Sequence, residues 1–334
     1  FSYYFYYKSS GAYFFLLAIV TVSDFFIARL MARATVHWQR KMWVAASLAI
    51  NLGLLCYFKY TNFLCDFFAS LTGGTFTAMD IFLPVGISFF TFQSLSYTID
   101  VYRRDVKTEH NIIDFGAYVV MFPQLIAGPI VRYADIAPQL KHRTHTLADA
   151  AYGARRFILG LSKKVLLANV LYELISAYKS AANVSVLFVW LYAAAYVLHL
   201  YFDFSGYSDM ARGTGAVFGL DLPENFHHPL QSYSVADFFG RFNISANRFV
   251  RKYVYQALGA EDNGPLSTSV NILLITMLMG LWYGINLNYL VWGAFLGLFI
   301  IFEVLYIERH VEKIPPYLCR MYTFIAILIS FCWY

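Results

Sequence analysis

Long apolar stretches constrain this chain more than any other feature. A helix that crosses a membrane needs about 20 mostly apolar residues. Stretches of this kind lie at residues 12–28, 42–58, 82–101, 187–204, 268–284, 287–306 and 320–334, with a weaker one at 158–177. Only 13% of the 334 residues are charged, whereas a soluble domain carries roughly 25%. The sequence therefore predicts an all-α, polytopic membrane protein in a helical bundle.

Basic residues in the connections predict which side of the membrane each connection faces. The 29–41 connection holds four bases and no acid, which is typical of a cytoplasmic loop. The 59–80 connection holds one base and two acids, so we expect it on the outer side. The net charge of +5 has the same origin in cytoplasmic loops and does not indicate a nucleic-acid partner.

Two segments are expected to enter the membrane without crossing it. Residues 113–131 are apolar but contain Pro123 and the pair Gly128-Pro129, and both flanks are basic. Broken backbone is tolerated at membrane depth only inside protein or beside a wet cavity, so this segment predicts a re-entrant loop at an internal chamber. Residues 234–258 alternate aromatic and basic side chains, which predicts an interfacial or re-entrant amphipathic helix.

The ends and the continuity of the chain bear on its domain organisation. The sequence begins without Met in an aromatic run and stops inside an apolar one, so we expect a protein truncated at both ends. Neither an internal repeat nor a low-complexity linker interrupts residues 1–334, which favours one transmembrane domain.

Polar residues inside an apolar helix are costly and usually functional. The richest group is HLYFDFSGYSD at residues 199–209, where His199 and Asp203 lie one helical turn apart. Asp203 could orient a histidine, bind a cation, or accept backbone N–H groups at a helix break beside Ser205 and Tyr207. The His227-His228 pair lies at a predicted loop boundary, and we predict no metal site.

Several long motifs carry a resemblance to a known family. They are LPVGISFFTFQSLSYTIDVYR (83–103), MFPQLIAGPIVRYADIAPQL (121–140), YFDFSGYSDMARGTGAVFGLDLPENF (201–226), FVRKYVYQALG (249–259) and MGLWYGINLNYLVWGAFLGL (279–298). Together they resemble the membrane-bound O-acyltransferases, in particular the alginate O-acetyltransferase branch. The resemblance runs from about residue 40 to the end of the chain.

The resemblance implies a fold, a reaction and a location. The fold is a bundle around a central tunnel, in a multi-pass protein of the cytoplasmic (inner) membrane among its lipids. No cofactor is bound; an acyl thioester, either acetyl-CoA or an acyl carrier, donates the acyl group from the cytoplasm. The acceptor is a hydroxyl of an exported polysaccharide or peptidoglycan. Periplasmic or extracellular proteins are the usual partners.

The resemblance also implies two catalytic histidines, and this chain has neither. The family motif W-x-R-W-H-x-S becomes FGRFNIS at residues 239–245, with Asn243 in the histidine position. The family motif G-x-W-H-G becomes GLWYG at residues 280–284, with Tyr283 in that position. Residues expected to line the tunnel around these two are Ser205, Tyr207, Asp209, Arg241, Ser245 and Trp282.

These replacements change the chemistry available to the chain. A histidine with a reference pKa near 6.5 can take the proton of an acceptor hydroxyl, whereas a phenol has a reference pKa near 10 and an Asn amide does not titrate. Losing a general base typically removes about 10²–10⁴ in rate. His199, paired with Asp203, is a candidate displaced base.

Three interpretations follow. The chain is a catalytically impaired homologue that serves as a scaffold or tunnel subunit of a cell-envelope assembly. Alternatively, it is an active O-acyltransferase with a rearranged site. In the third, it transports a small group or lipid through the tunnel without chemistry.

Overall fold

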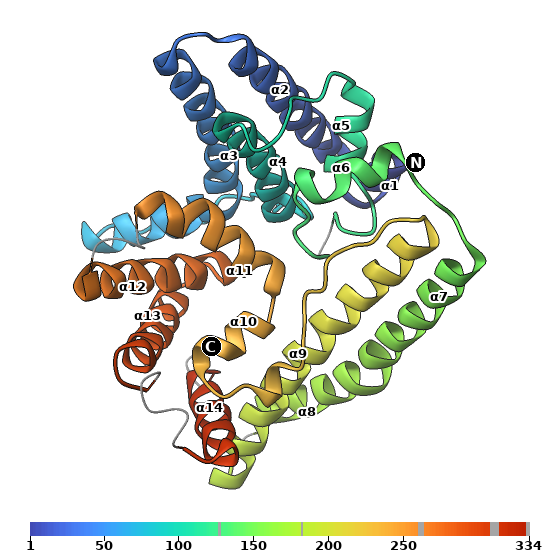
Figure 1. The fold of residues 1–334 in the computed structure, drawn as a ribbon. Coiled ribbons are helices and arrows are strands. Elements are labelled where there is room, and N and C mark those ends of the chain that lie inside the picture. Colours follow the sequence, from blue (N-terminus) through green and yellow to red (C-terminus); the bar gives the residue numbers. More distant parts are fainter. Residues whose placement is uncertain (126–127, 182, 260–263, 308–313, 332–334) are drawn as a thin grey trace. The chain divides into compact units, whose positions relative to one another are not determined.

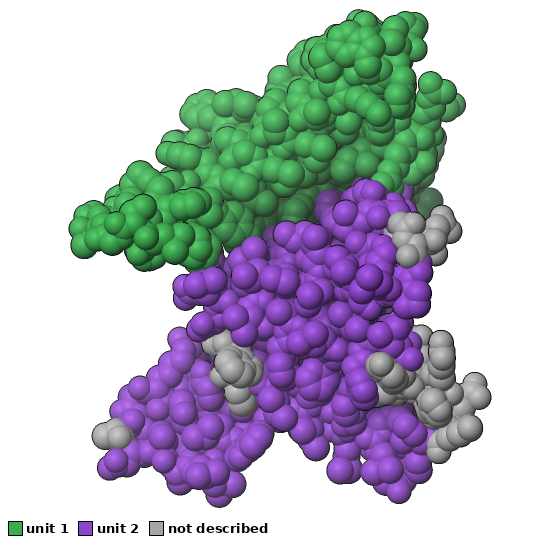
Figure 2. Space-filling model, turned by 90° about the vertical axis from the view of Figure 1, so that its left-hand side faces the viewer, with its two compact units in different colours: residues 1–150, 215–222 green, residues 151–214, 223–334 purple. Residues whose placement is uncertain are grey.

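The structure of the chain is a computed structural model that describes residues 1–125, 128–181, 183–259, 264–307 and 314–331. These residues form helices and no β-strand, and one isolated antiparallel bridge joins Phe226 to Phe242. The all-α prediction is therefore confirmed. The chain divides into two compact units (Figure 2), unit 1 with residues 1–150 and 215–222, and unit 2 with residues 151–214 and 223–334. That residues 1–334 act as one domain stays a prediction.

Unit 1 contains the N-terminal helices. They are α1 (Ser2–Ser10), the 3-10 turn η1 (Gly11–Tyr13), α2 (Phe14–Arg33), α3 (His37–Leu71), α4 (Ile87–Arg103), α5 (Ile112–Val119) and α6 (Tyr133–Lys141). Helices α2, α3 and α4 pack on one another, and their apolar core includes the fully buried Leu17, Phe90 and Tyr118.

A carboxylate lies inside this packing. Asp24 of α2 is fully buried and accepts hydrogen bonds from Ser47 Oγ at 2.6 Å and Asn51 Nδ2 at 2.8 Å, both on α3. Ser94 of α4 donates a third hydrogen bond to the same carboxylate. A buried charge or polar group is tolerated only when its bonding capacity is met, so this network joins the three helices.

The predicted re-entrant segment 113–131 folds back inside unit 1. Helix α5 covers its first part, with the Asn111 side chain accepting from Ile113 N at its start. Tyr118 Oη lies 3.0 Å from both Gln93 O on α4 and Val131 O. The end of the segment, at Val131, is therefore held beside α4. The described residues of this segment are largely buried in protein, which is the condition for irregular backbone at membrane depth.

Unit 2 contains the remaining helices. They are α7 (Leu147–Ser162, of which the first turn belongs to unit 1), the π-helical turn η2 (Lys163–Ala168), α8 (Asn169–Ser180), α9 (Val186–Val217), η3 (Pro229–Gln231), α10 (Val235–Arg241), α11 (Ile244–Val250), η4 (Arg251–Tyr255), η5 (Gln256–Leu258), α12 (Gly264–Tyr283), α13 (Leu287–Phe302), η6 (Glu303–Ile307) and α14 (Pro316–Phe331).

Two close helix pairs organise unit 2. The run α7–η2–α8 lies against α9 (Figure 1), and a Cβ added to Gly160 would meet Gly206 O at 2.4 Å. Helices α12 and α13 form a second pair, in which a Cβ on Gly280 would meet Tyr289 O at 2.1 Å. Both contacts bring backbones to a distance that only glycine allows.

Five helical stretches are long and apolar enough to cross a membrane. They are residues 2–33, 37–71, 186–217, 264–283 and 287–305. The predicted spans at 82–101 and 320–334 correspond to α4 and α14, which are shorter, and residues 332–334 lie outside the described residues. The weaker span at 158–177 lies inside the continuous helical run from α7 to α8. The multi-pass membrane class is thus confirmed.

Candidate functional site

The segment that carries Asn243 is a broken helix. We predicted one amphipathic helix over 234–258, and this was wrong, because α10 ends at Arg241 and α11 begins only at Ile244. Asn243 lies between them with a φ of 56°. This left-handed conformation is one that Asn tolerates better than most side chains. Asn243 therefore lets the chain turn at this point.

A second segment holds the break in place. Asn225, which is 1% exposed, accepts hydrogen bonds at its Oδ1 from the backbone N and the Oγ of Ser245, at 3.0 and 2.8 Å. Its own carbonyl accepts from Ile244 N at 3.0 Å, and His227 N donates to Arg241 O at 3.0 Å. The sequence analysis did not single out Asn225, although it lies in the quoted motif 201–226.

Asn243 and Tyr283, the two residues predicted to replace family histidines, contact each other. Asn243 Nδ2 donates a hydrogen bond to Tyr283 Oη at 2.9 Å. Tyr283 is the last residue of α12, where Gly284 gives room to the Tyr289 ring, since a Cβ on that glycine would lie 2.0 Å from the ring. Trp292 of α13 packs edge-on against the Tyr283 ring with centroids 5.8 Å apart. The pair thus rests on an aromatic support.

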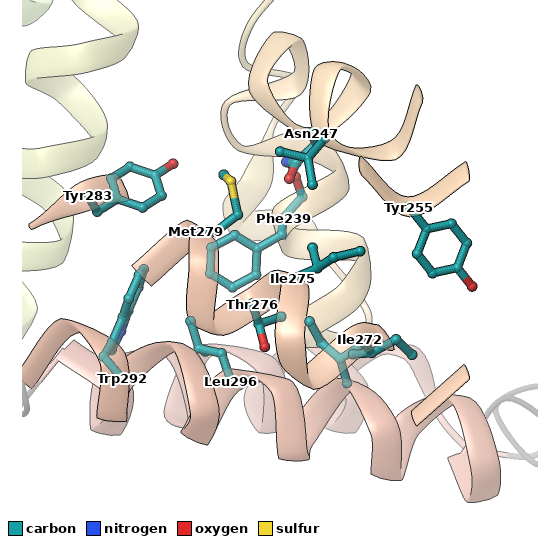
Figure 3. A pocket seen from close by; sticks show the side chains of 12 residues that line it. Phe239, Asn247, Tyr255, Ile272, Ile275, Thr276, Met279, Tyr283, Trp292 and Leu296 are labelled. Carbon is teal, nitrogen blue, oxygen red and sulfur yellow. The ribbon is translucent and has the colours of Figure 1, made fainter. Parts of the chain in front are cut away.

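A cavity of about 210 Å³ extends from Tyr283 and is called the Tyr283 cavity below. Figure 3 shows Tyr283 and Tyr255 at its opposite ends, with Phe239 and Met279 between them. The lining residues come from α10 to α13 and are mostly apolar: Phe239, Asn247, Val250, Tyr255, Ile272, Ile275, Thr276, Met279, Tyr283, Trp292, Leu296 and Ile300. The cavity therefore suits an apolar group better than a charged one.

A buried carboxylate fixes the helix that brings Phe239 to the cavity. Glu303, which is 2% exposed, accepts from the backbone N of Val235 at 2.7 Å and of Ala236 at 2.9 Å, the first turn of α10. An anion at a helix N-terminus satisfies free amides and favours the helix dipole. Glu303 was missed in the sequence analysis, yet an acid inside the apolar run 287–306 is the signal that identifies such residues.

His199 and Asp203 each contact a different partner and do not pair with each other. His199 Nδ1 lies 2.9 Å from Ala168 O, and its ring packs against Tyr172. Asp203 forms an ion pair with Lys164. Helix α9 continues unbroken past both residues, so Asp203 does not cap a helix break.

Asp209 anchors the α7–η2 run to α9. Its carboxylate, with a side chain 9% exposed, accepts from Arg156 Nε at 2.9 Å and from Lys163 Nζ at 2.6 Å. Ser205 is 1% exposed, and its hydroxyl has no hydrogen-bond partner among the residues that the structure describes. Tyr207 is half-buried on the same helix.

The other predicted tunnel residues flank the Asn243–Tyr283 pair. Arg241 Nε donates to Asp237 Oδ1 at 2.7 Å, and Trp282 packs against Tyr283 with centroids 5.0 Å apart. Ser245 is held by Asn225, as described above. Of the residues predicted for the site, only Tyr283 lines the Tyr283 cavity. Within the described ranges, His, Cys, Asp and Glu side chains form no group that could hold a metal ion.

The arrangement offers hydrogen-bond donors and an apolar cavity beside a paired amide and phenol.

The comparisons with known proteins agree with the sequence motifs. The family model described as MBOAT, membrane-bound O-acyltransferase family, matches residues 103–316.

Three relatives illustrate the similarity. A probable alginate O-acetylase of Pseudomonas aeruginosa is 42% identical over 289 residues, which are 85% of this chain and 56% of that protein. Another from Azotobacter vinelandii is 39% identical, over 94% of this chain and 64% of that protein. A peptidoglycan O-acetyltransferase of Helicobacter pylori is 31% identical, over 83% and 58%. The chain thus spans between 56% and 64% of the length of these relatives. By these matches, the chain belongs to the membrane-bound O-acyltransferase family.

Proposed function

We propose that this protein belongs to the lineage that O-acetylates exported polysaccharide or peptidoglycan, and that its own acyl transfer is impaired. It would act in the cytoplasmic membrane as a scaffold or tunnel subunit of a cell-envelope assembly, beside periplasmic or extracellular partners. One observation carries this proposal: Asn243 and Tyr283, which the motif resemblance predicts to replace the family histidines, are hydrogen-bonded to each other.

The reaction explains why this pair matters. An acceptor hydroxyl must lose its proton as its oxygen attacks the carbonyl carbon of the thioester, whereupon the C–S bond breaks and the thiolate leaves. A base near the working pH takes that proton. An amide does not titrate, and the reference pKa of a phenol is about 10 against about 6.5 for an imidazole. At neutral pH the Asn243–Tyr283 pair therefore donates and accepts hydrogen bonds without removing a proton.

A specific contact favours an active enzyme as the second candidate. Because Ala168 O can only accept, the 2.9 Å contact with His199 Nδ1 places the proton of the neutral ring on that nitrogen. The lone pair then lies on Nε2, which is the form a general base needs. In this alternative, His199 takes the proton of an acceptor hydroxyl, and acetyl-CoA or an acyl carrier supplies the acyl group. Asp203, held by Lys164, would not assist it.

Acetyl transfer by the purified chain in nanodiscs tests both candidates. The assay supplies acetyl-CoA or an acetylated carrier and follows acetyl groups appearing on alginate or peptidoglycan fragments. The impaired protein shows transfer near the protein-free background, and the double variant Asn243→His with Tyr283→His raises it by about 10²–10⁴. Tyr255→His, at the far end of the same cavity, is the matched control and leaves the background unchanged.

Acetyl transfer by the parent chain would contradict the impaired interpretation. If the parent chain transfers acetyl at an ordinary enzymatic rate and His199→Ala abolishes this transfer, the impaired interpretation is wrong and the second candidate holds.

A further inference from the structure

A basic pocket lies in unit 1, far along the sequence from the Asn243–Tyr283 pair. It has a volume of about 580 Å³ and lies where α2 and α4 end and α3 begins. Its lining includes four cations, Arg33, Arg40, Arg104 and Lys107, together with His110. No Asp or Glu is among its lining residues. The name basic pocket refers to this cavity below.

The cations of the basic pocket are not neutralised within the described part of the chain. Arg33, Arg40, Arg104 and Lys107 form no ion pair with a carboxylate of the described residues. Glu109, the acid that follows Lys107 most closely, bonds instead to Lys141 at 2.8 Å and Tyr133 at 2.6 Å. Like charges gathered without a counterion create a positive potential that attracts anions.

The Arg40 side chain is held in a fixed position at the basic pocket. It is only 8% exposed, and its Nη2 donates to the C-terminal carbonyls of α4, to Val101 O at 3.1 Å and Tyr102 O at 2.8 Å. Its Nε and Nη1 have no hydrogen-bond partner among the described residues. Neither nitrogen is among the buried side-chain atoms that lack a partner, so both are open to an anion that can pair with the guanidinium. The side chain is therefore held in place with unused donors at the pocket.

The backbone around the basic pocket has two further features. Helix α3 begins at His37, and the preceding residue Val36 offers no side-chain cap to its first amides, so its positive end remains available to an anion. Arg104 adopts a left-handed backbone with a φ of 67°. For a residue other than glycine this conformation is strained, and such strain gathers at ligand clamps.

We propose that the basic pocket binds a phosphate group, as a phosphate ester or diphosphate. Guanidinium groups match the geometry of phosphate oxygens and bind them in a bidentate manner. The pocket lies at a connection whose bases predict the cytoplasmic side. Two sources can present this chemistry there: the headgroup of an anionic phospholipid in that leaflet, or a soluble phosphorylated molecule. This inference does not depend on whether the Asn243–Tyr283 pair is catalytically impaired.

Two binding measurements distinguish these sources. The purified chain in nanodiscs of phosphatidylcholine is titrated with inorganic pyrophosphate by calorimetry. In parallel, the chain in nanodiscs of phosphatidylcholine and phosphatidylglycerol is analysed by native mass spectrometry for retained phosphatidylglycerol. A soluble ligand predicts pyrophosphate binding, and a lipid ligand predicts retention of phosphatidylglycerol over phosphatidylcholine.

Charge-removing variants assign the binding to the basic pocket. Arg33→Gln with Lys107→Gln changes two exposed residues, so the fold is kept. The double variant should weaken the observed binding about tenfold or more, because it removes two charge-assisted contacts to phosphate. Lys41→Gln removes one positive charge at a residue that is adjacent to Arg40 in the sequence. Lys41 does not line the pocket, so this variant should change affinity less than about twofold. The proposal is overturned if the parent binds neither probe, or if Lys41→Gln weakens binding as much as the double variant.

Discussion

The side-chain amide of Asn243 hydrogen-bonds to the phenolic oxygen of Tyr283 at 2.9 Å, across 40 positions of sequence. Two motifs that are separate in the chain thus converge at one point, at the break between α10 and α11 and at the end of α12. The contact uses one N–H group of the Asn243 amide and the oxygen of the Tyr283 phenol. It supports the structural role that we propose for the pair.

Substitutions of Asn243 should separate its backbone role from its side-chain role. Asn243→Gly keeps the left-handed backbone and loses the hydrogen bond to Tyr283, so we expect a loss of about 1 kcal/mol in the free energy of unfolding. Asn243→Ala loses the same bond and adds strain at the φ of 56°, so it should cost about 1 kcal/mol more. Thermal unfolding in detergent, followed by tryptophan fluorescence, ranks the variants. Equal midpoints for Gly and Ala would show that the turn tolerates any side chain.

Removing the Glu303 charge should loosen α10. Glu303→Gln leaves one oxygen to serve two backbone amides, those of Val235 and Ala236, and we expect a loss of about 1.5–3 kcal/mol in stability. Glu173→Gln, on the exposed surface of α8, is the matched control and should have no effect. Hydrogen exchange at the first turn of α10 measures the change directly. Unchanged protection there in Glu303→Gln would contradict the assigned contact.

A methyl group at Gly160 should separate α7 from α9. Its Cβ would lie 2.4 Å from the backbone oxygen of Gly206, a contact that only a backbone shift relieves, so Gly160→Ala should destabilise the protein by about 1–3 kcal/mol. At Gly240 an added Cβ meets nothing within 4 Å. Gly240→Ala in α10 should therefore stabilise slightly, by about 0.5–1 kcal/mol, through helix propensity. The two unfolding midpoints should move in opposite directions.

Acid should weaken the 105–111 connection of unit 1 through Glu109. Burial alone would raise the pKa of Glu109, but Lys141, the Tyr133 hydroxyl and two backbone amides outweigh it and lower the pKa to about 2 from 4.5. A depressed carboxylate pKa stabilises the folded state above the unfolded pKa, and this contribution is lost as pH falls from about 4.5 to about 2.

A pH series of unfolding midpoints checks the effect of Glu109. The parent should lose about 1–2 kcal/mol more than Glu109→Gln between pH 6 and pH 2.5, because solvent screens the half-exposed Lys141. Parallel curves for the two proteins would mean that Glu109 does not carry the predicted contribution.

The helical class of the elements was predictable from the sequence. A segment inside a membrane must form its backbone hydrogen bonds internally, so apolar runs such as 268–284 and 287–306 are expected to be helices. The ends of the helices were less predictable from the sequence. Helix α9 runs on to Val217 through Gly206, since the glycine is stabilised by close packing on α7 rather than by local propensity. The break at Asn243 was missed because alternating aromatic and basic residues fit a continuous helix equally well.

The sequence singled out Asn243 and Tyr283 but could not give the contact between them. That the two replace family histidines stays a prediction from the motifs, and sequence spacing carries no information on a hydrogen bond between distant segments. The suggested pairing of His199 with Asp203 rested on helical spacing alone. Lys164 reaches Asp203 from the neighbouring π-helical turn η2, a partner that the spacing within one helix could not reveal.

The buried Asp24 links the insertion of α2 to the packing of the helices that follow it in the chain. Its carboxylate takes its donors from α3 and α4, and both helices follow α2 in the chain. A nascent α2 therefore reaches the lipid with an acid whose partners have not yet been synthesised, at an insertion cost of about 2.5–3.5 kcal/mol. The apolar residues of α2 outweigh this cost, and the donors on α3 and α4 remove it when those helices pack against α2.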